Sequence, residues 1–232
     1  LMKRCFLVVI DSLGVGEAPD ADIYGDLGTN TLGNVSKAVG GVDLPNMDKL
    51  GFGKITDVLN MNDLNIATVG RLSEDSVGND STTGHWELAG LTTKTEFSIF
   101  ENGFPQELIQ KIEKEAKCYF IGNRHASGTE IIEELGSEHL ETGNLILYTS
   151  GDSVFQIAAH EEVCSIEKLY EICKISRKYC NQYNIGRVIA RPFVGDKGNF
   201  KRTYDRKDFG MTPPGETILS LLHKNKIKTY GI

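Results

Sequence analysis

The feature that most limits the fold is an alternation, between residues 105 and 195, of amphipathic segments with short apolar runs. The amphipathic segments have the 3.6-residue period of helices and cover 105–117, 127–135 and 165–180. The apolar runs are typical of strands and cover 118–123, 144–150, 153–159 and 186–195. Chains that alternate helices and strands in this way form α/β proteins. Ser127 and Glu130 have the spacing of a capping box at the start of the second helix.

The two ends of the chain add elements of the same kinds. The run RCFLVVI at 4–10 is typical of a strand that is covered on both faces, and Asp11 follows it directly. The remaining patterns predict helices at 31–39, from about Thr82, and at 216–226, and strands at 65–73 and 227–232. Because the last strand reaches the final residue, we expect the chain to stop inside a domain.

The pattern of predicted helices and strands changes near residue 92 and again at Pro213. The most economical layout is an α/β core domain over 1–92 that is interrupted by an inserted α+β domain. We expect that inserted domain at 93–212, with a return to the core over 213–232.

Charge and cysteine content exclude several classes of protein. The formal net charge of −7 argues against a broad nucleic-acid surface, which would need a basic patch. No apolar stretch is long enough for a membrane span, and FLVVI is too short for a signal peptide. The five cysteines form no CxxC pair, so we expect reduced thiols and a cytoplasmic protein. The oligomeric state cannot be read from the sequence.

The segment GNDSTTGHWELAG, at 78–90, combines three hydroxyl residues with the start of a helix. A helix N-terminus favours a phosphate group, so Ser81 is a candidate nucleophile for phosphoryl transfer. The alternative is an ordinary helix cap, which is the commonest use of serine and threonine at this position. His85 follows Ser81 by one helical turn and could face the same site.

Other candidate site residues lie near predicted strand ends. Asp11 could bind a divalent metal or could cap the turn that follows it. Arg187, Arg191 and Arg202 could bind phosphate through their planar guanidinium groups. Asp152 lies in a tight turn and could accept hydrogen bonds from sugar hydroxyls.

Five segments together resemble the phosphopentomutase family, which belongs to the alkaline phosphatase superfamily. They are FLVVIDSLGVGEAPDA, NDSTTGHWELAG, IGNRHASGTEIIEELG, YTSGDSVFQIAAHEE and GRVIARPFVGDKGNFKRT, in the order of the family. The resemblance implies an alkaline-phosphatase-like core, incomplete here, with an inserted α+β cap domain. It also implies interconversion of ribose or deoxyribose 1-phosphate and 5-phosphate. The family uses a phosphorylated hydroxyl residue, two divalent cations, usually Mn²⁺, and a sugar bisphosphate activator.

The resemblance also implies roles for individual residues. Asp11 and Ser81 match metal ligands, and Ser81 matches the phosphorylated position. The positions that match contacts to the pentose phosphate are Ser150, Asp152, Val154, Arg187 and Arg202.

The chain departs from the family pattern in two places. Asn79-Asp80-Ser81 stands where the family usually has Lys-Asp-Thr, and Thr82 is an alternative acceptor. The Asp-His-Gly and Thr-Asp-His-Thr segments that carry most metal ligands in the family do not occur here. We therefore expect this chain alone to be inactive or nearly so. A cofactor-independent phosphoglycerate mutase and a non-catalytic sugar-phosphate-binding fragment are the alternative interpretations.

Overall fold

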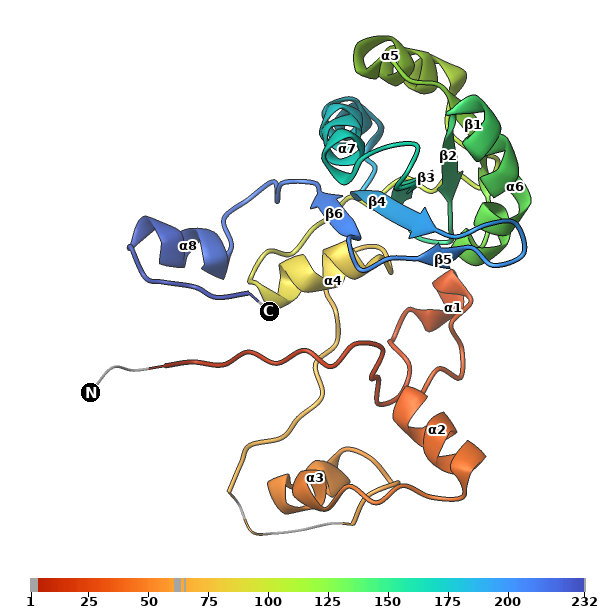
Figure 1. Cartoon of the computed structure of the whole chain (residues 1–232). Coiled ribbons are helices and arrows are strands. Elements are labelled where there is room, and N and C mark those ends of the chain that lie inside the picture. Colours follow the sequence, from red (N-terminus) through yellow and green to blue (C-terminus); the bar gives the residue numbers. More distant parts are fainter. Residues whose placement is uncertain (1–3, 61–63, 65, 232) are drawn as a thin grey trace. The chain divides into compact units, whose positions relative to one another are not determined.

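The structure is a computed structural model that describes residues 4–60, 64 and 66–231. The chain divides into two compact units, which cover Leu1–Glu74 and Asp75–Ile232 (Figure 1).

The first unit contains short helices joined by loops. They are α1 (Ala21–Tyr24), α2 (Thr31–Val39), α3 (Pro45–Leu50) and the 3₁₀ helix η1 (Phe52–Lys54). Helix α2 confirms the helix predicted at 31–39. The Asn30 side chain caps it by accepting a hydrogen bond from the N–H of Gly33.

The strands predicted at 4–10 and 65–73 are wrong, because their described residues have no regular secondary structure. From Phe6 to Ile10 the side chains are between 48% and 82% exposed. A buried strand needs hydrogen-bonded neighbours as well as apolar side chains. The described part of this unit contains no strand that could pair with 4–10. The strand predicted at 227–232 is also not formed over its described residues, 227–231.

The second unit is built on a mixed sheet of six strands (Figure 1). The strands are β1 (Phe120–His125), β2 (Leu145–Thr149), β3 (Val154–His160), β4 (Arg187–Val194), β5 (Lys201–Arg202) and β6 (Lys207–Gly210). Their order is β1-β2-β3-β4-β5, and β6 also pairs with β4. β1 with β2 and β3 with β4 are parallel pairs, whereas β2 with β3, and β4 with β5 and β6, are antiparallel. The α/β class predicted from the alternating pattern is thus confirmed.

The helices of this unit are α4 (Ser81–Leu88), α5 (Gln106–Ala116), α6 (Gly128–Thr142), α7 (Ile166–Cys180), η2 (Asn181–Tyr183) and α8 (Ile218–Lys224). Helices α5 and α7 cover one face of the sheet, and α6 covers the other. Side chains of β2 alternate between two apolar clusters, as the period of a strand requires. Leu145 and Leu147 pack with α5 and α7, whereas Ile146 and Tyr148 pack with α6. The sheet is therefore the middle layer of this unit.

The helix predicted at 127–135 extends to Thr142 in the structure, and its N-terminus lacks the predicted capping box. Ser127 is the N-cap of α6, but its side chain forms no capping bond to the helix backbone. Its Oγ lies 3.0 Å from the Oγ1 of Thr129 instead. The capping box with Glu130 is therefore not formed. The predicted domain limits at 92/93 and 212/213 stay predictions.

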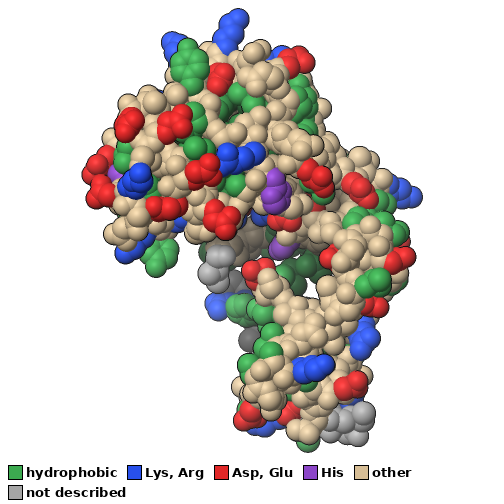
Figure 2. All heavy atoms as spheres, turned by 90° about the vertical axis from the view of Figure 1, so that its right-hand side faces the viewer, with side chains coloured by type: hydrophobic (Ala, Val, Ile, Leu, Met, Phe, Trp, Pro, Cys, Tyr) green, Lys and Arg blue, Asp and Glu red, His purple; other side chains and the backbone are tan. Residues whose placement is uncertain are grey.

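The surface carries charges of both signs. In Figure 2 acidic and basic side chains are interspersed over the visible face. None of the helices in the described part of the chain has the length and apolar character needed to cross a membrane. All five cysteines are free thiols.

Candidate functional site

The N-terminus of α4 is capped by Asp80, not by one of the three hydroxyl residues. Asp80 has an extended backbone, and its Oδ1 accepts a hydrogen bond of 2.7 Å from the N–H of Thr82. Ser81 is thus the first helical residue, and its side chain is not used as the cap. Ser81 is exposed, Thr82 is half-buried and Thr83 is buried. Of the three hydroxyls, that of Ser81 is the one open to an incoming substrate.

A second bond from Asp80 joins the start of α4 to the turn between β2 and β3. Its Oδ2 accepts a hydrogen bond of 3.2 Å from the N–H of Ser153. The Ser153 hydroxyl donates to the carbonyl of Ser98 at 2.6 Å and accepts from the N–H of Gly186 at 3.1 Å. The turn, β4 and α4 therefore have fixed relative positions.

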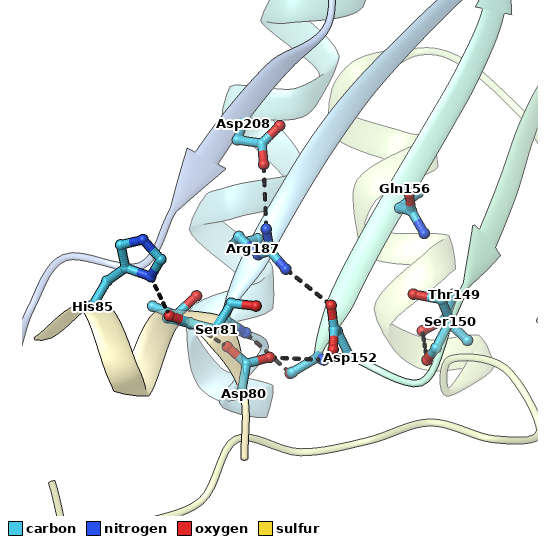
Figure 3. A network of polar contacts seen from close by, with 12 residues as sticks. Asp80, Ser81, His85, Thr149, Ser150, Asp152, Gln156, Arg187 and Asp208 are labelled. Carbon is cyan, nitrogen blue, oxygen red and sulfur yellow. Dashed lines mark hydrogen bonds and ion pairs between the residues drawn. The ribbon is translucent and has the colours of Figure 1, made fainter. Parts of the chain in front are cut away.

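Arg187, the first residue of β4, lies between two carboxylates (Figure 3). Its Nη2 lies 3.2 Å from the Oδ2 of Asp152, and its Nη1 lies 3.5 Å from the Oδ2 of Asp208. Arg206 also contacts Asp208, through two hydrogen bonds of 2.8 Å. The Arg187 side chain is only 20% exposed, and its Nε is buried without a partner in the described structure. The guanidinium is thus oriented before any substrate binds.

The structure brings three predicted site residues into one polar network. Ser81 on α4 directly follows Asp80, which binds Ser153, and Asp152 in the same turn pairs with Arg187 on β4 (Figure 3). Ser150 lies in the same turn and is half-buried, while Val154 is buried at the start of β3. The roles predicted for these residues stay predictions.

Two other predicted residues lie outside this network. Asp11 belongs to the first unit, so its predicted role beside Ser81 stays a prediction. Arg202 lies on β5, near the start of α6. Its guanidinium is 2.6 Å from the position that a Cβ would occupy at Gly128.

His85 does not contact the Ser81 hydroxyl. Its Nδ1 lies 2.6 Å from the backbone carbonyl of Ser81, one helical turn earlier. A carbonyl oxygen only accepts, so Nδ1 carries the proton and the ring is bound to the helix backbone. The one-turn spacing thus places His85 against a backbone group of α4.

Glu87 fixes the other end of α4, and its role was not predicted. Its carboxylate accepts hydrogen bonds of 2.8 Å from the N–H of Asp75 and 2.7 Å from the N–H of Ser76. Hydrogen bonds from the Ser76 side chain and from these backbone groups lower the pKa of Glu87. Trp86 packs edge-on against Phe97, with ring centroids 5.3 Å apart. Both ends of the helix that carries Ser81 are therefore attached to the unit.

Metal binding was predicted for Asp11 and Ser81. Among the described residues, no group of three or more His, Cys, Asp or Glu side chains could hold a metal ion. The described residues thus do not supply a metal centre by themselves.

The sheet and this network define an α/β protein with an exposed serine at a helix start, beside paired carboxylate and guanidinium groups. No family model matches the chain. It is 51% identical over 234 residues to the phosphopentomutase of Carboxydothermus hydrogenoformans. It is 51% identical over 233 residues to that of Thermotoga petrophila, and 49% identical over 235 residues to that of Clostridium novyi.

These alignments cover 99% to 100% of this chain and 60% of each relative. The chain is therefore related to the phosphopentomutases over its full length and spans about 60% of their length. The resemblance inferred from the five motifs is confirmed.

Proposed function

We propose that this chain functions in a phosphopentomutase, which interconverts ribose or deoxyribose 1-phosphate and 5-phosphate. The observation that carries the proposal is the identity of about 50% to phosphopentomutases along the whole chain. Under this proposal, residues 93–212 form the cap that is inserted into an alkaline-phosphatase-like core.

Ser81 is the proposed acceptor of the phosphoryl group. It is exposed at the first position of α4, where free N–H groups and the helix dipole favour a phosphate. Asp80 holds this end of the helix against the turn that carries Asp152. The serine oxygen would form a bond to phosphorus while the bond from phosphorus to the sugar oxygen breaks, and the hydroxyl proton would pass to the departing sugar oxygen. The reverse transfer would place the phosphoryl group on the other sugar oxygen, whose proton would return to the serine oxygen.

The residues next to Ser81 suit a sugar phosphate. Asp152 can accept hydrogen bonds from sugar hydroxyls, and Arg187 can donate two parallel bonds to a phosphate. Because Arg187 already contacts Asp152 and Asp208, a bound phosphate would exchange with one of these carboxylates. We propose Ser150, Val154 and Arg202 as further contacts to the pentose phosphate.

The cofactors proposed with this function are two divalent cations, for which Mn²⁺ is the proposed ion, and a sugar bisphosphate activator. Bound cations would lower the proton affinity of the attacking hydroxyl and neutralise phosphate charge. Asp11 and Ser81 are the proposed ligands from this chain.

The proposal is tested by locating the phosphoryl group. The protein is incubated with ribose 1,5-bisphosphate and Mn²⁺, and the phosphorylated residue is identified by mass spectrometry. We expect phosphate on Ser81 and none in a Ser81→Ala variant. Phosphate on Thr82 or Thr83 would contradict the assignment of Ser81, and Ser220→Ala serves as a control for non-specific loss of label.

A second measurement tests the reaction itself. Conversion of ribose 5-phosphate in the presence of Mn²⁺ would support the phosphopentomutase proposal and contradict the prediction that the chain alone is inactive. Binding without conversion would favour a sugar-phosphate-binding role for this chain. Conversion of 3-phosphoglycerate in place of the pentose phosphate would favour the phosphoglycerate mutase interpretation.

A further inference from the structure

Arg177 lies in the last turn of α7 and binds the segments that follow this helix. Its Nη2 donates a hydrogen bond of 2.6 Å to the carbonyl of Ile185, and its Nη1 donates to the carbonyls of Gly186 and Phe209 at 3.2 Å and 3.4 Å. Its Nε donates to the Oδ1 of Asn181 at 2.9 Å. Because each guanidinium nitrogen has an acceptor, the group is held in one orientation.

The charge of Arg177 faces carbonyl oxygens and not a carboxylate. The residue is half-buried, and burial lowers its pKa. Among the residues that the structure describes, it forms no ion pair with a carboxylate. An arginine in the last turn of a helix can bind the carbonyls of that turn, where the helix dipole favours a positive charge. The four acceptors of Arg177 lie beyond the end of α7 instead, which indicates that it holds the segments that follow.

Two of these carbonyls flank an ion pair of the candidate site. Gly186 immediately precedes Arg187 on β4, and Phe209 immediately follows Asp208 on β6. The two strands are antiparallel neighbours in the sheet. A single nitrogen of Arg177, its Nη1, therefore joins both strands at the place where Arg187 and Asp208 lie 3.5 Å apart.

Arg177 reaches this ion pair through the backbone, from the opposite face of the sheet. Val188 and Phe209 pack in the apolar cluster that α7 covers. Successive side chains of a strand point to opposite faces, so those of Arg187 and Asp208 point away from α7. Arg177 therefore acts on the pair by fixing the carbonyls next to it, and not by contact with the two side chains.

The position of β6 depends on few bonds, and Arg177 supplies one of them. This strand has four residues, and among the described strands it pairs with β4 alone. On β4, both backbone groups of Gly186 are in use. Its N–H donates to the Oγ of Ser153 at 3.1 Å, and its carbonyl accepts from Arg177 and from the N–H of Met211 at 2.9 Å. Loss of the Arg177 guanidinium would thus leave β6 free to shift against a fixed start of β4.

We propose that Arg177 is a positioning residue for phosphate binding by Arg187. It holds β6 against the start of β4, so that Asp208 keeps the Arg187 guanidinium in the orientation that receives a sugar phosphate. This inference rests on the proposed function, in which Arg187 binds the phosphate group. If Arg177 only stabilised the end of α7, its loss would lower stability and leave both the surroundings and the affinity of Arg187 unchanged.

The first test uses nuclear magnetic resonance on the full chain and needs no ligand. The Nε of Arg187 is buried, so its proton should exchange slowly with water and give a signal, which Arg187→Gln identifies by removing it. Arg177→Met removes the guanidinium and keeps most of the apolar stem. We expect it to shift the Arg187 signal, as Asp208→Asn should. Lys174→Met, at an exposed position of the same helix, is the matched control and should leave the signal in place. An unchanged Arg187 signal in Arg177→Met would overturn the proposal.

The second test is the binding of ribose 5-phosphate by isothermal titration calorimetry. We expect Arg177→Met to raise the dissociation constant roughly fivefold at unchanged stoichiometry, because Arg187 then presents its two N–H groups to the phosphate less often. Arg177→Lys should lie between this variant and the parent, since an ammonium group lacks the planar fork of arginine. A purely structural role would reduce the number of molecules that bind, so a lower stoichiometry with the dissociation constant of the parent would overturn the proposal.

The two tests separate this inference from the proposed function. If the parent protein does not bind ribose 5-phosphate, the proposed function fails, and a shifted Arg187 signal in Arg177→Met still shows that Arg177 holds Arg187. If the parent binds the sugar phosphate and Arg177→Met binds it equally well, the proposed function stands and the inference is overturned. Should Arg177→Met not fold, Arg177→Lys decides, because an unchanged Arg187 signal together with the affinity of the parent would contradict the positioning role.

Discussion

The carboxylate of Asp80 joins the first turn of α4 to Ser153, which lies 73 residues further along the chain. One oxygen caps the helix through Thr82, and the other accepts from the N–H of Ser153. The position of Ser81, the next residue after Asp80, is therefore set by the sheet as well as by its own helix.

Replacement of this carboxylate should destabilise the second unit. We expect Asp80→Ala to lower the free energy of unfolding by about 1–2 kcal/mol, because the helix loses its cap and Ser153 loses an acceptor. Asp80→Asn should have a smaller effect, because asparagine is also a good cap. Urea unfolding measures the free energy of unfolding of both variants. Asp205→Ala, at an exposed position, is the control. Equal stability of Asp80→Ala and the parent would contradict the role of Asp80.

Arg187 should control the affinity for sugar phosphates under the proposed function. We expect Arg187→Gln to weaken the binding of ribose 5-phosphate at least tenfold, because Asp152 and Asp208 then face the ligand without a positive charge between them. Arg187→Lys should recover only part of the affinity, since an ammonium group lacks the planar fork of arginine. Calorimetric titration measures these affinities. An Arg187→Gln protein that binds ribose 5-phosphate as tightly as the parent would show that Arg187 does not contribute to the binding.

The stability of the second unit should depend on His139 in mildly acidic solution. Burial lowers the pKa of His139, whose Nδ1 lies 2.6 Å from the carbonyl of Asn144. Its Nε2 accepts a hydrogen bond of 2.8 Å from the N–H of His160, so a second proton would face this N–H group. The unfolded chain takes up a proton below a pH of about 6.5 that the folded chain resists. The free energy of unfolding should thus be highest above this pH and fall below it.

Unfolding by urea at a series of pH values measures this dependence. We expect the free energy of unfolding of His139→Gln to change less with pH than that of the parent protein, at pH values below about 6.5. His125→Gln, at an exposed position, should keep the profile of the parent. Identical profiles for all three proteins would exclude His139 as the titrating group.

The cysteines should differ strongly in reactivity at neutral pH. Burial raises the pKa of Cys118 and of Cys180 to about 12, and it also raises the pKa of Cys164 and Cys173. For a pKa of 12, the thiolate fraction at pH 7 is on the order of 10⁻⁵. Cys5 is exposed. A thiol reagent should therefore modify Cys5 quickly and the other four only after unfolding. Rapid modification of a second thiol in the native protein would contradict the burial of this group.

Local sequence patterns predicted the second unit better than the first. Helices α5 and α7 and strands β2, β3 and β4 have clear periods of 3.6 or 2, and their apolar side chains pack within this unit. The run at 4–10 has an equally clear composition. It is not a strand, because pairing depends on distant segments and the described part of its unit offers none.

In the candidate site, too, local sequence patterns predicted local features and not the contacts between distant segments. The sequence pattern indicated one of the hydroxyl residues as the alternative cap of α4, whereas Asp80, which directly precedes them, caps the helix. Ser153 and Asp208 were not recognisable, since their environments depend on contacts between segments far apart in the sequence. The alternating charges at 201–208 are typical of a solvated loop, but this segment contains β5 and the start of β6, and Asp208 on β6 contacts Arg187.

The contacts of Ser153 also bear on the order in which the protein folds. Its bonds to Asp80, Ser98 and Gly186 close loops of 73, 55 and 33 residues at a single point. Contacts of such long range form only after the entropy of loop closure has been overcome, which favours their formation late in folding. We expect the amide of Thr82 to become protected from hydrogen exchange after those of β3 and β4, and earlier protection would contradict this order. The geometry around Ser81 would then be among the last parts of the unit to assemble.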